Sequence, residues 1–267
     1  MTTPESRGGD DAVLVSLDGG IATVTLNRPD VRNAINGAMR RGWWEALTTL
    51  DADPSVAAII LTGTDPAFCA GLDLRELGRS GSDLEPSRGG STGSRSPFPP
   101  LTTPLIGAVN GPAITGGFEL ALNCDFLIAS ERARFADTHS RVGVRPGWGL
   151  TPLLAAAVGR RRARQISLTG NFVPAEQALL WGLVNEVVPH EELLPRCRAL
   201  AGDIAANDRP GVTRMLATYR QQDEASLAAE WAAESAGAAE FGRQIGFDAA
   251  EVEARRQGII DRGRSQL

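Results

Sequence analysis

Short runs of apolar, often β-branched residues alternate with helical patterns as far as Pro174, and only helical patterns follow it. Such runs, bounded by turn residues, are typical of strands, whereas apolar residues at three- and four-residue spacing indicate helices. Strands mixed with helices, followed by helices alone, predict an α/β core with a helical C-terminal extension. The chain of 267 residues is long enough for one large domain of this kind.

The turns between the runs place the elements along the chain. Asp18-Gly19-Gly20 separates the first two strand runs, Val13–Leu17 and Ile21–Leu26, as in a β-hairpin. Asn110-Gly111-Pro112 is a second expected turn. The further expected strands are Val56–Leu61, Leu105–Val109, Asp125–Ala129 and Ala133–Ala136, and the expected helices are Asn36–Leu50, Gly116–Cys124, Thr151–Val158, Ala175–Gly182, Glu191–Ala206, Ser226–Ala239 and Phe247–Arg256.

Two stretches lack these patterns. Residues 1–11 are polar and do not resemble a secretory signal, so we interpret them as a disordered tail that precedes a core spanning residues 12–206. Gly78 to Pro100 consists mostly of Ser, Gly, Pro and Arg. A loop this long in a compact domain is either a lid beside a site or an inert insertion, and the sequence allows both.

Charge and missing residue types exclude several classes of function. The net charge of −5 argues against a nucleic-acid-binding surface, and no apolar run approaches the ~20 residues that span a bilayer. The chain contains no lysine, which excludes a Walker-type phosphate loop and Schiff-base catalysis. Only two histidines are present, so no metal site is expected. Three widely spaced cysteines (Cys69, Cys124 and Cys197) suit the reduced thiols of a cytoplasmic protein.

Two glycine-containing turns are candidates for binding a ligand oxygen. Cys69-Ala70-Gly71-Leu72 and Thr115-Gly116-Gly117 each follow an expected strand, and glycine there permits a backbone N–H to face a ligand. Two such N–H groups, one at a helix N-terminus, form an oxyanion hole that stabilises an enolate. Glycine after a strand is also an ordinary turn residue, so neither pattern decides the question alone.

Glu119 and His139 are the candidate acid/base residues. Glu119 lies in the first turn of the expected helix, where a carboxylate is stabilised by the helix dipole. Its neighbours are apolar, and burial among them would raise its pKa enough for proton transfer near neutral pH. His139 follows Asp137, which can orient the imidazole or cap a turn. His190, between Pro189 and two glutamates, is expected at a solvated helix start and receives no role.

Several ordered motifs resemble the crotonase (enoyl-CoA hydratase/isomerase) family. The central one is Leu105–Ala113 followed by Gly116–Asp125. The correspondence runs from about Ala12 to Pro189, and several motifs in one order are far more specific than a single glycine pattern. The other similar segments are Asn27-Arg28-Pro29 with Asn33–Asn36, Ala67–Leu74, Leu168–Gly170, Ala175–Ala178 and Trp181–Asn185.

The resemblance implies a fold and an assembly. The family fold is a spiral of ββα units with a helical C-terminal region, here residues 207–267, which forms trimers that often pair into hexamers. Apolar residues at Leu216, Leu227, Trp231, Phe241 and Ile245 agree with such packing against a neighbouring subunit. The implied substrate is an acyl-coenzyme A thioester, with no further cofactor.

The resemblance also implies roles for individual residues. The thioester oxygen would lie between the amides of Leu72 and Gly116, and the main chain around Ala70 would contact the adenine ring. Arg28 and Arg32 are candidate contacts to the coenzyme A phosphates. Hydratases of the family hold a water between two glutamates; the first matches Glu119, and a glycine that helps to position the water matches Gly147.

The second glutamate is replaced by His139, which leaves three functions open. An imidazole beside Glu119 can support hydration of an enoyl-CoA thioester, the function we favour because Glu119 and Gly147 are in place for water. A single carboxylate would suffice for an enoyl-CoA isomerase, and an altered site is also compatible with a non-catalytic acyl-CoA-binding protein. A related serine peptidase is excluded because no serine lies between Ser96 and Ser130, and a Rossmann dehydrogenase because no GxGxxG follows a strand.

Overall fold

The computed structural model describes residues 12–73 and 96–244, and residues 254, 258–259, 261–263 and 265–266 near the C-terminus. The strands form two sheets, one of six strands in the order β1-β2-β3-β4-β6-β9 and one of three strands in the order β5-β7-β8. The expected α/β core with a helical C-terminal region is confirmed, but the expectation that only helices follow Pro174 was wrong, because residues 186–188 form a strand of the larger sheet. The tail at 1–11, most of the loop at 78–100 and the expected helix at 247–256 lie outside the described residues, apart from Ala254.

The larger sheet begins with the expected hairpin. β1 (Val13–Asp18) and β2 (Ile21–Leu26) pair antiparallel around Gly19-Gly20, and the remaining strand pairs of this sheet are parallel. Both turn glycines have positive φ values, 55° and 82°, which glycine adopts without a steric penalty. The other strands are β3 (Ala58–Gly63), β4 (Leu105–Val109), β6 (Phe126–Ser130) and β9 (Glu186–Val188).

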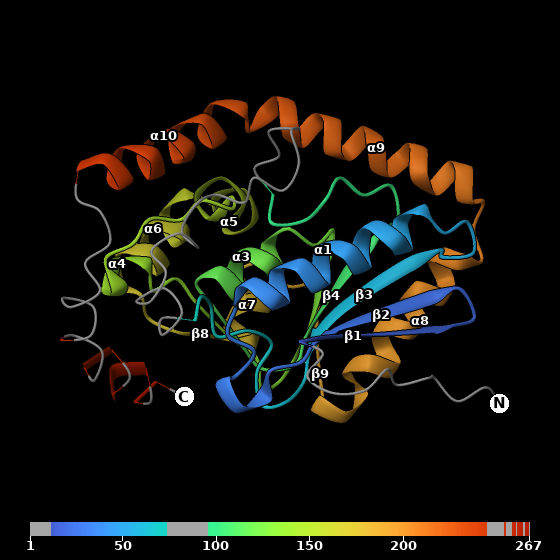
Figure 1. Cartoon of the computed structure of the whole chain (residues 1–267), viewed down its shortest axis with the longest axis horizontal. Coiled ribbons are helices and arrows are strands. Elements are labelled where there is room, and N and C mark those ends of the chain that lie inside the picture. The colour runs from blue at the N-terminus through green and yellow to red at the C-terminus, as the bar shows by residue number, and fades with distance from the viewer. Residues whose placement is uncertain are drawn as a thin grey trace.

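Alternate residues of the central strands face two different helix layers. Ile59 and Leu61 pack with α1 (Gly37–Ala52), whereas Ala58 and Ile60 pack with α8 (Leu193–Ala205). Because both faces of the parallel sheet are covered, its strands read as continuous apolar runs rather than as alternating patterns. Figure 1 shows α1 and α8 on opposite sides of this sheet.

The smaller sheet carries the residues that lead to the site. β5 (Pro112–Ile114) pairs in parallel with β7 (Arg134–Ala136), which pairs antiparallel with β8 (Val173–Pro174). The interpretation of residues 110–112 as a turn only was therefore wrong at Pro112, which opens a strand. Three helices follow directly from these strands: α3 (Gly116–Leu122), α4 (His139–Val142) and α7 (Ala175–Leu180).

The remaining helices form the outer layer. α5 (Leu150–Val158) is close to the expected helix, whereas α6 (Arg160–Thr169) was not anticipated from the sequence. α9 (Arg209–Ser226) lies in the expected helical C-terminal region, although its bounds were not predicted. α9 and α10 (Ala228–Gln244) run end to end along one side of the molecule, above α1 and α5 (Figure 1). Two short 3-10 helices are η1 (Pro29–Val31) and η2 (His190–Glu192). No helix in the described part of the chain has the length and apolar character needed to cross a membrane.

Candidate active site

The two glycine turns predicted from the sequence meet in the structure. The segment from Cys69 pairs with β5, because the Cys69 amide donates to the Pro112 carbonyl and the Ile114 amide donates to the Cys69 carbonyl. A methyl group placed on Gly116 would lie 3.7 Å from the Gly71 Cα atom, so the two turns are in near contact. Neither the Leu72 nor the Gly116 amide has a hydrogen-bond partner among the described residues.

The backbone directions favour a shared target for these two amides. Ile35 bonds to the residues on either side of Leu72: its amide donates to Gly71, and its carbonyl accepts from Asp73. The Gly71 carbonyl and the Leu72 N–H belong to one trans peptide, so they point in opposite directions. The Leu72 N–H therefore points away from Ile35, toward the side on which β5 and Gly116 lie. Two unpartnered amides at adjoining turns match the chemistry of an oxyanion hole.

Close packing and backbone strain fix the start of α3. A Cβ on Gly117 would lie 2.1 Å from the Cys69 carbonyl oxygen, so only glycine fits there. Thr115, just before the helix, has a φ of 54° and a ψ of −110°, a conformation that β-branched residues avoid and that costs about 1–3 kcal/mol. The Thr115 hydroxyl lies 2.5 Å from that of Thr138, which ties this strained turn to the residue before His139.

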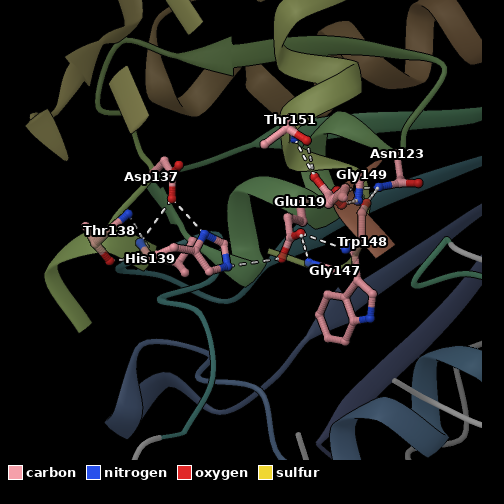
Figure 2. Close-up of polar contacts among 11 residues, drawn as sticks. Glu119, Asn123, Asp137, Thr138, His139, Gly147, Trp148, Gly149 and Thr151 are labelled. Carbon is pink, nitrogen blue, oxygen red and sulfur yellow. Dashed lines mark hydrogen bonds and ion pairs between the residues drawn. The ribbon is translucent and has the colours of Figure 1, made fainter. Parts of the chain in front are cut away.

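Glu119 projects from α3 into a buried environment and is held by two backbone amides. Its side chain is 4% exposed, and its Oε1 atom accepts hydrogen bonds from the amides of Trp148 at 2.8 Å and Gly147 at 3.2 Å (Figure 2). The Gly147 amide, which the resemblance assigns to a water, is thus directed at the Glu119 carboxylate itself. Asn123, one turn further along α3, donates to the Trp148 carbonyl and so fixes the same turn.

His139 faces the other oxygen of Glu119. The His139 Nε2 atom lies 3.7 Å from Glu119 Oε2, too far for a direct hydrogen bond. On the far side of the ring, Nδ1 lies 2.7 Å from Asp137 Oδ1, and the same oxygen accepts the His139 backbone amide (Figure 2). Asp137 is a permanent acceptor when ionised, so Nδ1 carries a proton and Nε2 is the atom that faces Glu119.

Burial and opposite charge set the protonation of this pair. Desolvation raises the pKa of Glu119 to about 7, against the lowering effect of His139 and the two amides. Burial disfavours the His139 imidazolium, yet the hydrogen bond to Asp137 and the charge of Glu119 outweigh it and raise the pKa of His139. Burial likewise opposes ionisation of Asp137, but its contacts with His139 lower its pKa. The site therefore holds a carboxyl group that titrates near neutral pH and, facing it, an imidazole whose protonated form is stabilised.

Sequence reasoning missed a third buried carboxylate, that of Glu234 on α10. Its side chain accepts hydrogen bonds from the Gly149 amide (2.7 Å), the Thr151 amide (2.7 Å) and the Thr151 hydroxyl (2.6 Å). In the segment from Gly147 to Thr151, the first two amides thus donate to Glu119, and the amides of Gly149 and Thr151 donate to Glu234. No local pattern distinguishes Glu234 from the other acidic residues of its helix.

The three candidate coenzyme A contacts are distributed around the loop that bears Leu72. The exposed Arg32 lies beside Ala70, because the Ala70 amide donates to the Arg32 carbonyl. Arg28 instead directs its guanidinium inward, to the Ala34 carbonyl at 2.5 Å and to the Asp73 carboxylate at 3.0 Å. Arg28 therefore anchors this loop, while Arg32 presents an exposed charge next to it.

A second constellation, Ser130-His190-Asp65, has the residue types of a hydrolytic triad without an accessible nucleophile. His190 is bound on both sides, by Ser130 Oγ at 3.0 Å and by Asp65 Oδ2 at 3.0 Å. Ser130 is completely buried, so its hydroxyl cannot reach a substrate. The expected solvated position of His190 was wrong, since its side chain is only 16% exposed.

Comparisons with known proteins agree with the geometry. The family model described as enoyl-CoA hydratase/isomerase matches residues 16–257. A probable peroxisomal enoyl-CoA hydratase of Arabidopsis thaliana is 41% identical over 199 residues, which are 74% of each chain. A crystal structure of enoyl-CoA hydratase from Mycobacterium tuberculosis H37Rv is 46% identical, with a TM-score of 0.79 over 86% of this chain and 97% of that one. An enoyl-CoA hydratase structure from Mycobacterium smegmatis is 42% identical, with a TM-score of 0.80 over 88% and 99%.

Proposed function

Because the chain belongs to the enoyl-CoA hydratase/isomerase family, we propose that it is a lyase that adds water across the 2,3 double bond of an enoyl-CoA thioester. The observation that carries this proposal is the pairing of the buried Glu119 carboxylate with the His139 imidazole, beside two unpartnered amides. The reaction needs hydrogen-bond donors that stabilise negative charge on the thioester oxygen, a base that takes a proton from water and an acid that gives a proton to carbon two. The described site contains a candidate for each.

The amides of Leu72 and Gly116 are the hydrogen-bond donors to the thioester oxygen. When hydroxide adds to carbon three, the electrons of the double bond move to the thioester oxygen and form an enolate. Two N–H donors aimed at that oxygen stabilise the developing charge without reorganisation. The strain at Thr115 supports this role, because strained backbone persists where the surrounding structure fixes a functional geometry.

Glu119 and His139 move the protons. Ionised Glu119 accepts a proton from the water whose oxygen bonds to carbon three. The His139 imidazolium, kept protonated by Asp137, delivers the proton that carbon two requires. Glu119 then carries a proton and His139 is neutral, and proton exchange restores both groups. With 3.7 Å between Nε2 and Oε2, one water molecule can contact both groups at once.

The acyl-CoA thioester is the substrate, and the proposed contacts with its nucleotide portion are those at the edge of the Leu72 loop. The main chain at Ala70 would contact the adenine ring, and Arg32 would meet a phosphate. A guanidinium is a suitable partner because it offers several N–H donors to phosphate oxygens. The inward contacts of Arg28 favour an indirect role for it, as the anchor of this loop.

The proposed assembly is a homotrimer or a dimer of trimers. α9 contains no buried residue, and its Met215 and Tyr219 are 64% and 61% exposed in the single chain. Large exposed apolar side chains on one helix are typical of a surface that contacts a partner. Light scattering coupled to size-exclusion chromatography tests this: a monomer at working concentration would contradict it.

Hydration of crotonyl-CoA, followed by the loss of absorbance of the conjugated thioester, tests the function. Wild type is expected to hydrate it, and Glu119→Gln is expected to lower kcat by roughly 10³-fold, within the range of general acid–base catalysis. His139→Ala should also impair turnover. Glu131→Gln, at an exposed turn after β6, is the matched control and should retain full activity. Unchanged activity in Glu119→Gln would eliminate the mechanism.

A further inference from the structure

Glu234 is buried at the junction of α10 and α5, and the proposed chemistry does not use it. The residue is 8% exposed, and both of its carboxylate oxygens accept hydrogen bonds. Burying a carboxylate is costly unless every oxygen is satisfied. The donors here are the amides of Gly149 and Thr151 at the N-terminus of α5, so a side chain of one helix caps another helix.

The turn that Glu234 binds is the same turn that binds Glu119. Gly147 and Trp148 donate to Glu119, and Gly149 donates to Glu234 in the next peptide. Three consecutive amides are therefore divided between two carboxylates. Gly149 has a φ of 90°, and a Cβ on it would lie 2.1 Å from the Trp231 ring, so α10 also packs directly on this turn.

We propose that Glu234 is a positioning residue for the Glu119–His139 pair: its carboxylate fixes the turn that presents two amides to Glu119, which makes α10 part of the active site. This inference rests on the proposed hydration, in which Glu119 is the base. A shift of the turn would move the Glu119 carboxylate and the groups around it. A displacement of a catalytic group by about 1 Å can lower the rate by roughly 10²-fold.

The charge of Glu234 supports the same role. Its negative charge contributes to raising the pKa values of both Glu119 and His139, after the larger effects of burial and their direct partners. α5, which lies against it, has no ionisable side chain. The charged groups on the surrounding elements include His139 on α4, Arg160 on α6 paired with Glu230, Arg220 on α9 paired with Asp125, and Arg40 on α1 over the Trp148 ring.

The test compares Glu234→Gln with Glu230→Gln. Glu230 lies one turn earlier on the same helix, is 43% exposed and pairs only loosely with Arg160 at 3.8 Å, so it is a matched carboxylate outside the site. Glu234→Gln is expected to lower kcat by roughly 10- to 100-fold, with KM changed by less than about threefold. Glu230→Gln should alter neither constant.

A second readout does not depend on turnover. The chain has only two histidines, so the His139 signal in an NMR titration can be assigned with a His190→Gln variant. Glu234→Gln should move the His139 titration to lower pH, and Glu230→Gln should not. A purely structural carboxylate would destabilise the fold without moving this titration. If wild type does not hydrate enoyl-CoA, the proposed function fails, while the titration still decides the coupling.

Two outcomes overturn the inference: a folded Glu234→Gln variant with unchanged kcat, or one with an unchanged His139 titration. If Glu234→Gln does not fold, Thr151→Val replaces it, because that change removes one of the three bonds and retains the carboxylate. Its kcat should then fall several-fold with KM unchanged. An unchanged kcat in a folded Thr151→Val variant would contradict the role of Glu234.

Discussion

The two histidines of this chain have similar partners, but only one of them is placed to transfer protons. His139 is bound at Nδ1 by Asp137, and its Nε2 faces the Glu119 carboxylate across 3.7 Å. His190 is bound at both ring nitrogens, by Ser130 and by Asp65, each at 3.0 Å. Among the described residues, only His139 therefore has a ring nitrogen that faces an ionisable group without a hydrogen bond to it.

The carboxylates opposite the two rings differ in the same way. Burial raises the pKa of Glu119 to about 7. For Asp65, burial acts in the same direction but is outweighed by hydrogen bonds from Asn110 and His190, and its pKa is lowered. A fully satisfied histidine that faces an ionised carboxylate holds segments together. A histidine with one unsatisfied nitrogen that faces a carboxyl group titrating near neutral pH can transfer protons.

The largest expected difference lies in catalysis. His139→Gln should lower the kcat of crotonyl-CoA hydration by roughly 10²- to 10³-fold, because the acid for carbon two is lost. His190→Gln should change kcat by less than about twofold in the same assay. Equal losses in the two variants would break the distinction between the two histidines.

The stability of Glu119→Gln should depend on pH. The folded-state pKa of Glu119 is raised, so its favourable contribution is present below its ordinary value of 4.5 and is lost as pH rises through about 7. Above that pH, the free energy of unfolding of Glu119→Gln should exceed that of wild type by on the order of 3 kcal/mol. Below pH 4.5, the two proteins should be equally stable. Thermal or urea unfolding across this range measures it.

Asp65→Asn is the control of opposite sign. The folded-state pKa of Asp65 lies below its ordinary value of 3.8, so its contribution is present above that pH and is lost as pH falls through the folded-state pKa. Asp65→Asn should therefore be less stable than wild type at neutral pH. If both variants changed stability with the same sign, the two carboxylates would not differ as described.

Asp137→Asn should have an intermediate effect on activity. The asparagine carbonyl can still accept a hydrogen bond from the Nδ1–H group, but the loss of the negative charge lowers the pKa of His139 and so reduces the imidazolium fraction at neutral pH. We expect kcat to fall by roughly tenfold, with the alkaline limb of the pH–rate profile moved to lower pH. A lowered kcat with an unmoved profile would indicate a purely structural role for Asp137.

The smallest expected effect is the stability of His190→Gln. Two hydrogen bonds, to Ser130 and Asp65, link the end of β6 to the loop before Ala67. Partial loss of these bonds should reduce the free energy of unfolding by about 1–2 kcal/mol. Urea denaturation measures this, and a variant as stable as wild type would show that His190 contributes nothing to the fold.

The sequence predicted the elements that have strong local signals and missed those defined by distant contacts. The hairpin at Gly19-Gly20, α1 and β4 were found because turn glycines and apolar spacing are local properties. α6 was missed because its sequence is rich in arginine and buries only Ala163 and Ile166. α9 lies in the expected helical region, but it buries no residue in the single chain, so no packing against the core marked its bounds.

The candidate site shows the same limit. Glu119, His139 and the two glycine turns were identified from motifs, and the structure brings them together. The role of Arg28 as an internal anchor depends on Asp73, and the capping of α5 depends on Glu234 in a helix far along the chain. Neither contact can be predicted from the neighbouring residues in the sequence, because each joins segments that approach one another only in the folded chain.

Incubation with trans-2-hexenoyl-CoA in ¹⁸O-labelled water, followed by mass spectrometry of the product, tests the account most directly. Hydration by Glu119 and His139 predicts a 3-hydroxyacyl-CoA product that is heavier than the substrate by one labelled water. A product of unchanged mass with a shifted double bond, or no product at all, would contradict it.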